Sequence, residues 1–220
     1  MTKREEFIAV YQENIQRRGA DRLLEWLDSD ASDFFTAPSS TRFHGAYEGG
    51  LVEHSLNVYE CLKDYLNRPR TKELYGMDYT PETIAVTALL HDICKVGFYA
   101  VDYRNAKNEQ GVWEKVPYYT VRDTLPYGHG EKSVYMIQSF MRLTRDEAFA
   151  IRYHMGFSGN EDKNSTGNVP AGSGSQRGGY GSNVLSGRVC EVIGQHRTKL
   201  CTQMACKAVR RALCGVAIGA

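Results

Sequence analysis

Residues 88–97 read Ala88-Leu89-Leu90-His91-Asp92-Ile93-Cys94-Lys95-Val96-Gly97, and they decide both the fold class and the chemistry expected of this 220-residue chain. An apolar helical run ends here in an imidazole followed directly by a carboxylate. Both groups are common ligands of divalent metals in proteins. An isolated His-Asp pair at a helix end is more often a polar pair facing solvent. Whether this pair binds a metal therefore depends on the other histidines that the fold brings near it.

Further histidines lie in segments with clear helical signals. His54 lies in the first turn of a helix predicted over residues 51–68, which ends before a proline. His129 precedes an apolar pattern that predicts a helix, and His154 lies in a helix predicted to open with a capping box at residues 144–147. The order of these segments predicts that several helices contribute to one site.

The remaining segments complete a mainly α-helical pattern with one β-hairpin. The first 28 residues predict two short helices with a break near Gly19. Thr80-Pro81-Glu82 is a strong opening for the helix that ends in His91. Residues 98–119 alternate aromatic and β-branched side chains around a polar turn that contains glycine, which predicts a β-hairpin.

His54, His91 and Asp92 together form a ligand set suited to one divalent metal ion, such as Mn, Fe, Ni, Zn or Mg. A bound metal lowers the pKa of water, so that hydroxide attacks a phosphate near neutral pH. His129 and His154 are candidates for holding a second metal ion, with Asp92 as the bridge, and the alternative for either histidine is to bind a substrate phosphate instead. One or two divalent metal ions are therefore the expected cofactors.

Four motifs carry a resemblance to a known family. They are Phe43-His44-Gly45-Ala46-Tyr47-Glu48-Gly49-Gly50-Leu51-Val52-Glu53-His54-Ser55-Leu56-Asn57-Val58, Leu89-Leu90-His91-Asp92-Ile93-Cys94-Lys95-Val96-Gly97, Gly128-His129-Gly130-Glu131-Lys132-Ser133 and Ile151-Arg152-Tyr153-His154-Met155-Gly156. With these motifs the chain resembles the HD-domain metal-dependent phosphohydrolase superfamily over roughly residues 30 to 162. Within that superfamily it is most similar to bacterial and phage HD hydrolases, like the HD domain of the YhaM-type 3'-5' exoribonucleases. The resemblance implies an HD-domain helical bundle with a small hairpin insertion.

The resemblance also implies a further ligand that this chain lacks. His54, His91 and Asp92 match the first metal site of the family, and His129 and His154 match the histidines of members with two metals. The family completes its first site with an Asp on a later helix. The last Asp of this chain is Asp162, in a loop, so the predicted first site has three of four expected ligands.

Composition divides the chain near residue 162. Residues 1–162 contain 19 Lys and Arg against 25 Asp and Glu, whereas residues 163–220 contain 8 against the single Glu191. We expect residues 1–162 to form the HD-type hydrolase domain and residues 163–220 to form an atypical Gly/Ser-rich linker and a basic tail that contains cysteines. A reading-frame shift near residue 168 would explain the change, and translation of the other frames of the coding DNA tests that hypothesis.

Asp92 and Lys95 are the predicted catalytic residues. Lys95 lies near the same helix end and is also a candidate for binding a substrate phosphate, although an ordinary solvated lysine is the alternative. His44, Arg122 and Lys132 are weaker candidates for substrate contact. The aromatic side chains of the hairpin suit either base stacking or ordinary packing.

The predicted function is hydrolysis of a phosphoester of a nucleotide or short oligonucleotide by metal-activated water. A phosphatase acting on another small metabolite is the alternative within enzymes. A nucleotide-binding or assembly module with impaired catalysis is the alternative from another class, because the final Asp is missing. The net charge of +1 argues against a large basic surface that would bind duplex nucleic acid. The absence of a long apolar stretch predicts a cytoplasmic protein with no membrane partner, and the oligomeric state is left open.

Overall fold

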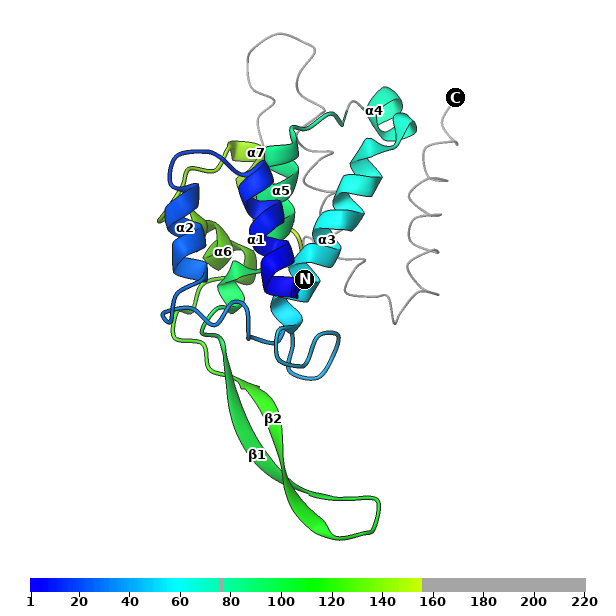
Figure 1. Cartoon of the computed structure of the whole chain (residues 1–220), viewed down its shortest axis with the longest axis vertical. Helices are drawn as coiled ribbons and strands as arrows, with labels where there is room; N and C mark the ends of the chain where they lie inside the picture. The colour runs from blue at the N-terminus through cyan, green and yellow to red at the C-terminus, as the bar shows by residue number, and fades with distance from the viewer. Residues whose placement is uncertain (76, 156–220) are drawn as a thin grey trace.

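The computed structural model describes residues 1–75 and 77–155, which form a helical body and a projecting β-ribbon (Figure 1). The prediction of a mainly α-helical fold with a small hairpin is confirmed. The predicted boundary at residue 162 and the tail at residues 163–220 lie outside the described residues. The elements are α1 (Lys3–Asn14), α2 (Ala20–Leu27), α3 (Gly50–Asn67), α4 (Pro69–Tyr75), α5 (Pro81–Leu90), the 3-10 turn η1 (Ile93–Lys95), β1 (Tyr99–Lys107), β2 (Trp113–Val121), α6 (His129–Gln138) and α7 (Arg145–Arg152).

Helix α5 is the centre of the body. Every residue from Ile84 to Leu90 is buried, as expected of a helix that is apolar on all sides. It contacts α1, α3 and α7. Thr80 caps its first turn by accepting a hydrogen bond from the Thr83 amide, and Pro81 occupies the first helical position. The residues that follow Leu90 therefore lie in the interior of the helical body.

Local signals set most of the other helix ends. The predicted capping box at the start of α7 is formed, because Thr144 and Glu147 bond reciprocally to each other's backbone amides. The helix predicted over residues 51–68 is α3, which begins one residue earlier at Gly50, so that His54 lies just beyond its first four residues. The short helix α4 was not predicted.

One glycine permits a close approach that the site requires. A Cβ atom at Gly130, in the first turn of α6, would lie 2.0 Å from the carbonyl oxygen of Arg152 at the end of α7. Only glycine can be accommodated there without a backbone shift. The start of α6, which carries His129, and the end of α7 are thereby held side by side. Helix α7 ends at Arg152, so His154 lies in the turn that follows the helix and not within it as predicted.

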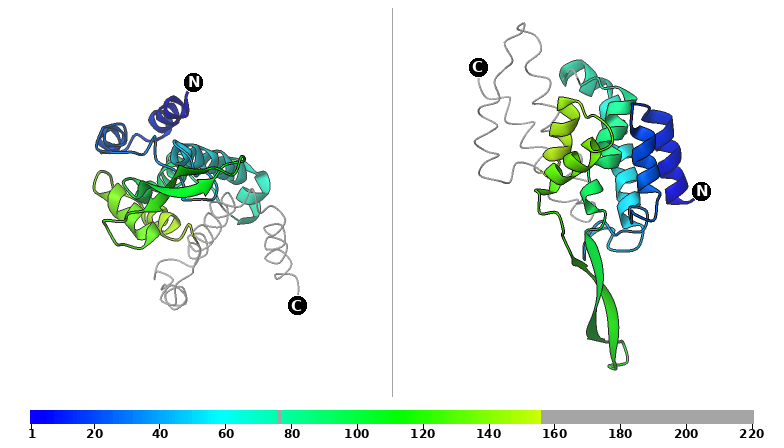
Figure 2. Two further views of the ribbon diagram at one scale, coloured as in Figure 1. Left: turned by 90° about the horizontal axis from the view of Figure 1, so that it is seen from below. Right: turned by 90° about the vertical axis from the view of Figure 1, so that its left-hand side faces the viewer.

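The two strands form an isolated antiparallel ribbon that extends away from the helices (Figures 1 and 2). Tyr99 pairs with Val121 at the root, and Lys107 pairs with Trp113 near the tip. Tyr103 and Trp113 are 63% and 66% exposed, so these aromatic side chains do not pack in the core.

None of the helices in residues 1–75 and 77–155 combines the length and the apolar character needed to cross a bilayer.

Candidate metal centre

His91 and Asp92 enter the interior at the end of α5. His91 is the last residue with helical backbone angles, and Asp92 leaves the helix before the 3-10 turn η1. Both residues are buried. Nδ1 of His91 donates to the carbonyl oxygen of Ala88 at 2.8 Å. Since a carbonyl only accepts, this bond fixes the tautomer, and the neutral ring presents the lone pair of Nε2 toward the carboxylate.

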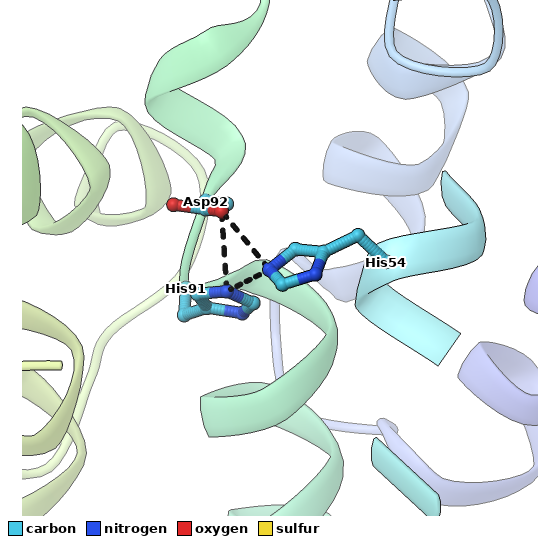
Figure 3. Close-up of side chains that lie close together, drawn as sticks. All are labelled: His54, His91 and Asp92. Carbon is cyan, nitrogen blue, oxygen red and sulfur yellow. Dashed lines mark hydrogen bonds and ion pairs between the residues drawn. The ribbon is translucent and has the colours of Figure 1, made fainter. Parts of the chain in front are cut away.

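His54, from α3, joins the pair on one side of the carboxylate (Figure 3). Its Nε2 lies 3.3 Å from Oδ2 of Asp92 and 3.1 Å from Nε2 of His91. Nε2 of His91 is also 3.3 Å from the same oxygen. The three side chains are buried, and their ligand atoms lie within 4.8 Å of one another. The structure thus brings together the three residues predicted for the first metal site.

His129 and His154 face the other oxygen of the same carboxylate. Nε2 of His129 lies 2.7 Å from Oδ1 of Asp92, and Nε2 of His154 lies 3.2 Å from it. Nδ1 of His154 donates to the carbonyl oxygen of Ile151 at 2.6 Å, so its Nε2 is also turned inward as a lone pair. Asp92 therefore separates two pairs of imidazoles, one pair at each oxygen.

The donor atoms fit a divalent cation. Nε2 of His154 is buried, and no hydrogen-bond donor in the described part of the chain reaches it. A buried lone pair that faces a carboxylate oxygen is unfavourable unless a cation lies between the two atoms. Nitrogen and carboxylate ligands in this combination suit Zn, Mn, Fe or Ni.

The charge states of the cluster also suit metal binding. Burial lowers the pKa of His91 to about 3, against the opposite effect of the Asp92 carboxylate. Burial likewise lowers the pKa of His129. Burial opposes ionisation of Asp92, but Lys95 and the neighbouring imidazoles hold its pKa well below the usual range. At neutral pH the Asp92 carboxylate is therefore ionised and the imidazoles of His91 and His129 are neutral, the forms in which these side chains bind metals.

Lys95 lies beside the carboxylate. Its Nζ donates to Oδ2 of Asp92 at 2.6 Å, and the side chain is almost fully buried. The solvated lysine considered as the alternative is therefore wrong. The ammonium offsets the buried negative charge and restrains the carboxylate.

Cys94 has a contact that the sequence did not indicate. Its Sγ lies 3.3 Å from Nδ1 and 3.9 Å from Nε2 of His129. Asp92, Cys94 and His129 also form a set whose ligand atoms lie within 4.8 Å of one another. Burial raises the pKa of the Cys94 thiol to about 12, so without a metal it is a thiol rather than a thiolate ligand. Its place two residues after Asp92, within a tight turn, is the signal that could have indicated this contact.

The other predicted site residues lie at different places around the centre. The ring of His44 lies 5.2 Å from the ring of His54, centroid to centroid. Lys132 is buried, but its ammonium pairs with Asp123 at 2.7 Å. Arg122 is exposed at the root of the ribbon, where its backbone amide donates to Phe98. Substrate contact by these three residues stays a prediction.

Comparisons with known proteins agree with this geometry. The profile of the HD domain matches residues 51–178, more than half of the chain. The dihydroneopterin 2',3'-cyclic phosphate phosphodiesterase of Methanocaldococcus jannaschii is 35% identical over 81 residues, which are 36% of this chain and 28% of that relative. The match therefore spans less than a third of the relative's length. No solved structure matches the chain.

Proposed function

Because this chain belongs to the HD domain family, we propose that it is a metal-dependent phosphohydrolase. The observation that carries the proposal is the arrangement around Asp92, whose two carboxylate oxygens each face a pair of imidazole nitrogens. Such an arrangement suits two metals bridged by one carboxylate, as found in enzymes that cleave phosphoesters. The similarity to a phosphodiesterase supports the same reaction class.

Each residue of the cluster has a proposed role. His54, His91 and Asp92 would hold the first cation, and His129 and His154 would hold a second one against the other oxygen of Asp92. A divalent cation bound there supplies Lewis acidity toward a phosphoryl oxygen and makes water acidic enough to attack phosphorus near neutral pH. Lys95 restrains the Asp92 carboxylate and is the cation nearest to a phosphate that approaches it.

The proposed substrate is a phosphoester of a nucleotide or short oligonucleotide. The relative's name describes a cyclic phosphodiester as its substrate, which supports a small phosphorylated molecule as the substrate class. His44 lies beside His54 and is proposed to contact the substrate at the edge of the centre. Arg122 and Lys132 are proposed to bind phosphate near the root of the ribbon.

The binding-module alternative is less well supported. The missing Asp favours it, and both Glu161 and Asp162 lie outside the described residues. A binding module, however, has no need for four histidines that converge on one buried carboxylate, because burying such a group is costly unless it is paired. A metal-dependent catalytic site accounts for the four histidines and for Asp92.

Metal content and turnover test the proposal together. The full chain should be purified without a histidine tag and analysed for transition metals. It should then be assayed with bis(p-nitrophenyl) phosphate and a panel of 2',3'-cyclic nucleotides, mononucleotides and short oligonucleotides. We expect one to two metal equivalents per chain and hydrolysis that is abolished in Asp92→Ala. Protein that stays metal-free in excess Mn²⁺ or Fe²⁺, or that binds metal and turns over no phosphoester, would falsify the proposal.

A further inference from the structure

The ribbon presents two chemically different faces. Successive side chains of a strand point to opposite faces, and the register pairs odd-numbered residues of β1 with odd-numbered residues of β2. We call the face formed by the odd-numbered residues of both strands the aromatic face. It carries three tyrosines and one tryptophan, at positions 99, 103, 119 and 113.

The aromatic face is exposed where the ribbon leaves the body. Tyr103 and Trp113 expose about two thirds of their surface, and Val101 and Val121 expose more than half. The ribbon projects from the helices in Figure 1 and in the right-hand view of Figure 2. A two-stranded ribbon gains little stability from exposed aromatic side chains, and a concentration of them on one face of a protein marks a binding surface.

Charge is divided between the two faces. The aromatic face carries Lys107 and Lys115 and no carboxylate, whereas Asp102 and Glu114 lie on the opposite face. Nζ of Lys107 lies 5.2 Å from the centre of the Trp113 ring. Exposed rings interleaved with cations suit a strand of bases and phosphates. A second copy is less suitable, because face-to-face pairing would bring together two lysine-bearing faces that lack a counter-charge.

The root of the aromatic face adjoins the metal centre. The Tyr99 hydroxyl donates to the carbonyl oxygen of Ser39 at 3.1 Å. The Ser39 hydroxyl in turn donates to the carbonyl oxygen of His44, whose ring packs beside His54. A ligand along the nine-residue strands, which span about 30 Å, would therefore end next to the cluster.

We propose that the aromatic face binds single-stranded nucleic acid, with bases stacked on Tyr103 and Trp113 and phosphates paired with Lys107 and Lys115. The strand then leads one of its phosphodiesters toward Asp92. This second step rests on the proposed function, whereas the binding itself does not.

Binding is tested by fluorescence anisotropy with fluorescein-labelled oligo(dT) and oligo(U) of 20 nucleotides, using the full chain in EDTA so that turnover does not interfere. We expect Trp113→Ala and Tyr103→Ala each to weaken binding about 10-fold, since loss of one stacked base has effects of this order. Lys107→Gln combined with Lys115→Gln should reduce the slope of log affinity against log salt by about 1.4. Arg104→Ala, which removes an exposed cation from the opposite face, is the matched control and should change the affinity less than about 2-fold.

The tryptophan itself provides a second readout. In Trp26→Phe, which removes the indole that packs against Phe140 in the body, oligo(dT) should quench the remaining fluorescence of Trp113. Equal affinity of wild type and Trp113→Ala would overturn the inference, as would equal binding of a 20-base-pair duplex. A dimer that Trp113→Ala dissociates, in protein that binds no oligonucleotide, would overturn it in favour of a second copy. Wild type that binds oligo(dT) but hydrolyses no phosphoester of the panel would leave the binding surface standing and remove the proposed function.

Discussion

Nε2 of His154 lies 3.2 Å from Oδ1 of Asp92, and both atoms present lone pairs because Nδ1 of His154 already donates to the Ile151 carbonyl. His91 has the same arrangement at the other oxygen, with Ala88 as the carbonyl partner. Two separate helix ends thus use the same local bond, from Nδ1 to the carbonyl three residues earlier, to aim Nε2 at one carboxylate. This repetition explains how two metal positions can be ordered around a single aspartate.

The two imidazole pairs should be separable by mutation. His154→Ala should remove one of two metal equivalents and leave the other, because it removes a ligand from the Oδ1 side only. His54→Ala should remove the equivalent on the Oδ2 side. Calorimetric titration of the metal-free protein with Mn²⁺ measures both stoichiometries. A single metal equivalent in wild type, or loss of all metal in His154→Ala, would contradict the assignment of two positions.

Asp92→Asn should abolish both positions. The amide keeps the volume but loses the charge and one acceptor oxygen, and it leaves the buried ammonium of Lys95 without its partner. We expect metal affinity to fall by at least about 100-fold, since losing even an outer-shell partner of a ligand costs 10- to 100-fold. Hydrolysis should fall below detection. Asp102→Asn, on the exposed ribbon, is the matched control and should retain the wild-type metal content.

Cys94 should act on metal binding through the orientation of His129. Its sulfur lies 3.3 Å from Nδ1 and 3.9 Å from Nε2 of the His129 ring. Cys94→Ala removes this contact, so the affinity for the second metal equivalent should fall about 10-fold while the affinity for the first is unchanged. Cys94→Ser keeps a polar contact, so the affinity should fall less. If both variants bind the first and the second metal equivalent equally weakly, Cys94 acts on the whole centre through packing and not through His129.

Much of the fold follows from local signals in the sequence. Thr80-Pro81 and the Thr144 capping box each fix a helix start by backbone chemistry within four residues, and both were predicted correctly. Pro69 was interpreted only as a stop for α3. Proline is also favoured at the first position of a helix, which is its place in α4.

The residues of the candidate site could be predicted from the sequence, but their arrangement in space could not. The motifs named His54, His91, Asp92, His129 and His154, and the structure brings all five side chains together. No sequence pattern specifies which oxygen of Asp92 faces which pair, because that depends on how α3, α6 and α7 pack around α5. The contact of Cys94 with His129 depends on the same packing.

The ion pair between Arg17 and Glu147 also joins residues far apart in the sequence, and we expect it to stabilise the folded chain. Arg17 lies between α1 and α2, whereas Glu147 lies in α7 with its side chain fully buried. The guanidinium donates to both carboxylate oxygens, at 2.6 and 2.8 Å, and Thr83 donates to one of them. Arg17 also pairs with Glu82, whose carboxylate lies 3.3 Å from the guanidinium. Glu147→Gln should therefore lower the free energy of unfolding at pH 7 by about 2 kcal/mol, because it removes the charge-assisted bonds to the buried carboxylate but leaves the cation one carboxylate partner.

The pair of Arg17 and Glu147 also predicts how the free energy of unfolding changes with pH. Burial alone would raise the pKa of Glu147, but the bonds from Arg17 and from the Thr144 amide hold its pKa below the usual value. A group whose pKa is lowered by folding adds stability above its unfolded pKa of about 4.3, and this stability is lost as the pH falls through the folded pKa. Urea unfolding followed by circular dichroism between pH 3 and pH 7 should therefore show a shallower loss in Glu147→Gln than in wild type. Glu6→Gln, which breaks an exposed pair with Lys3, should follow the wild-type curve to within about 0.5 kcal/mol. Parallel curves for Glu147→Gln and wild type would show that the Arg17 pair contributes nothing to the acid sensitivity.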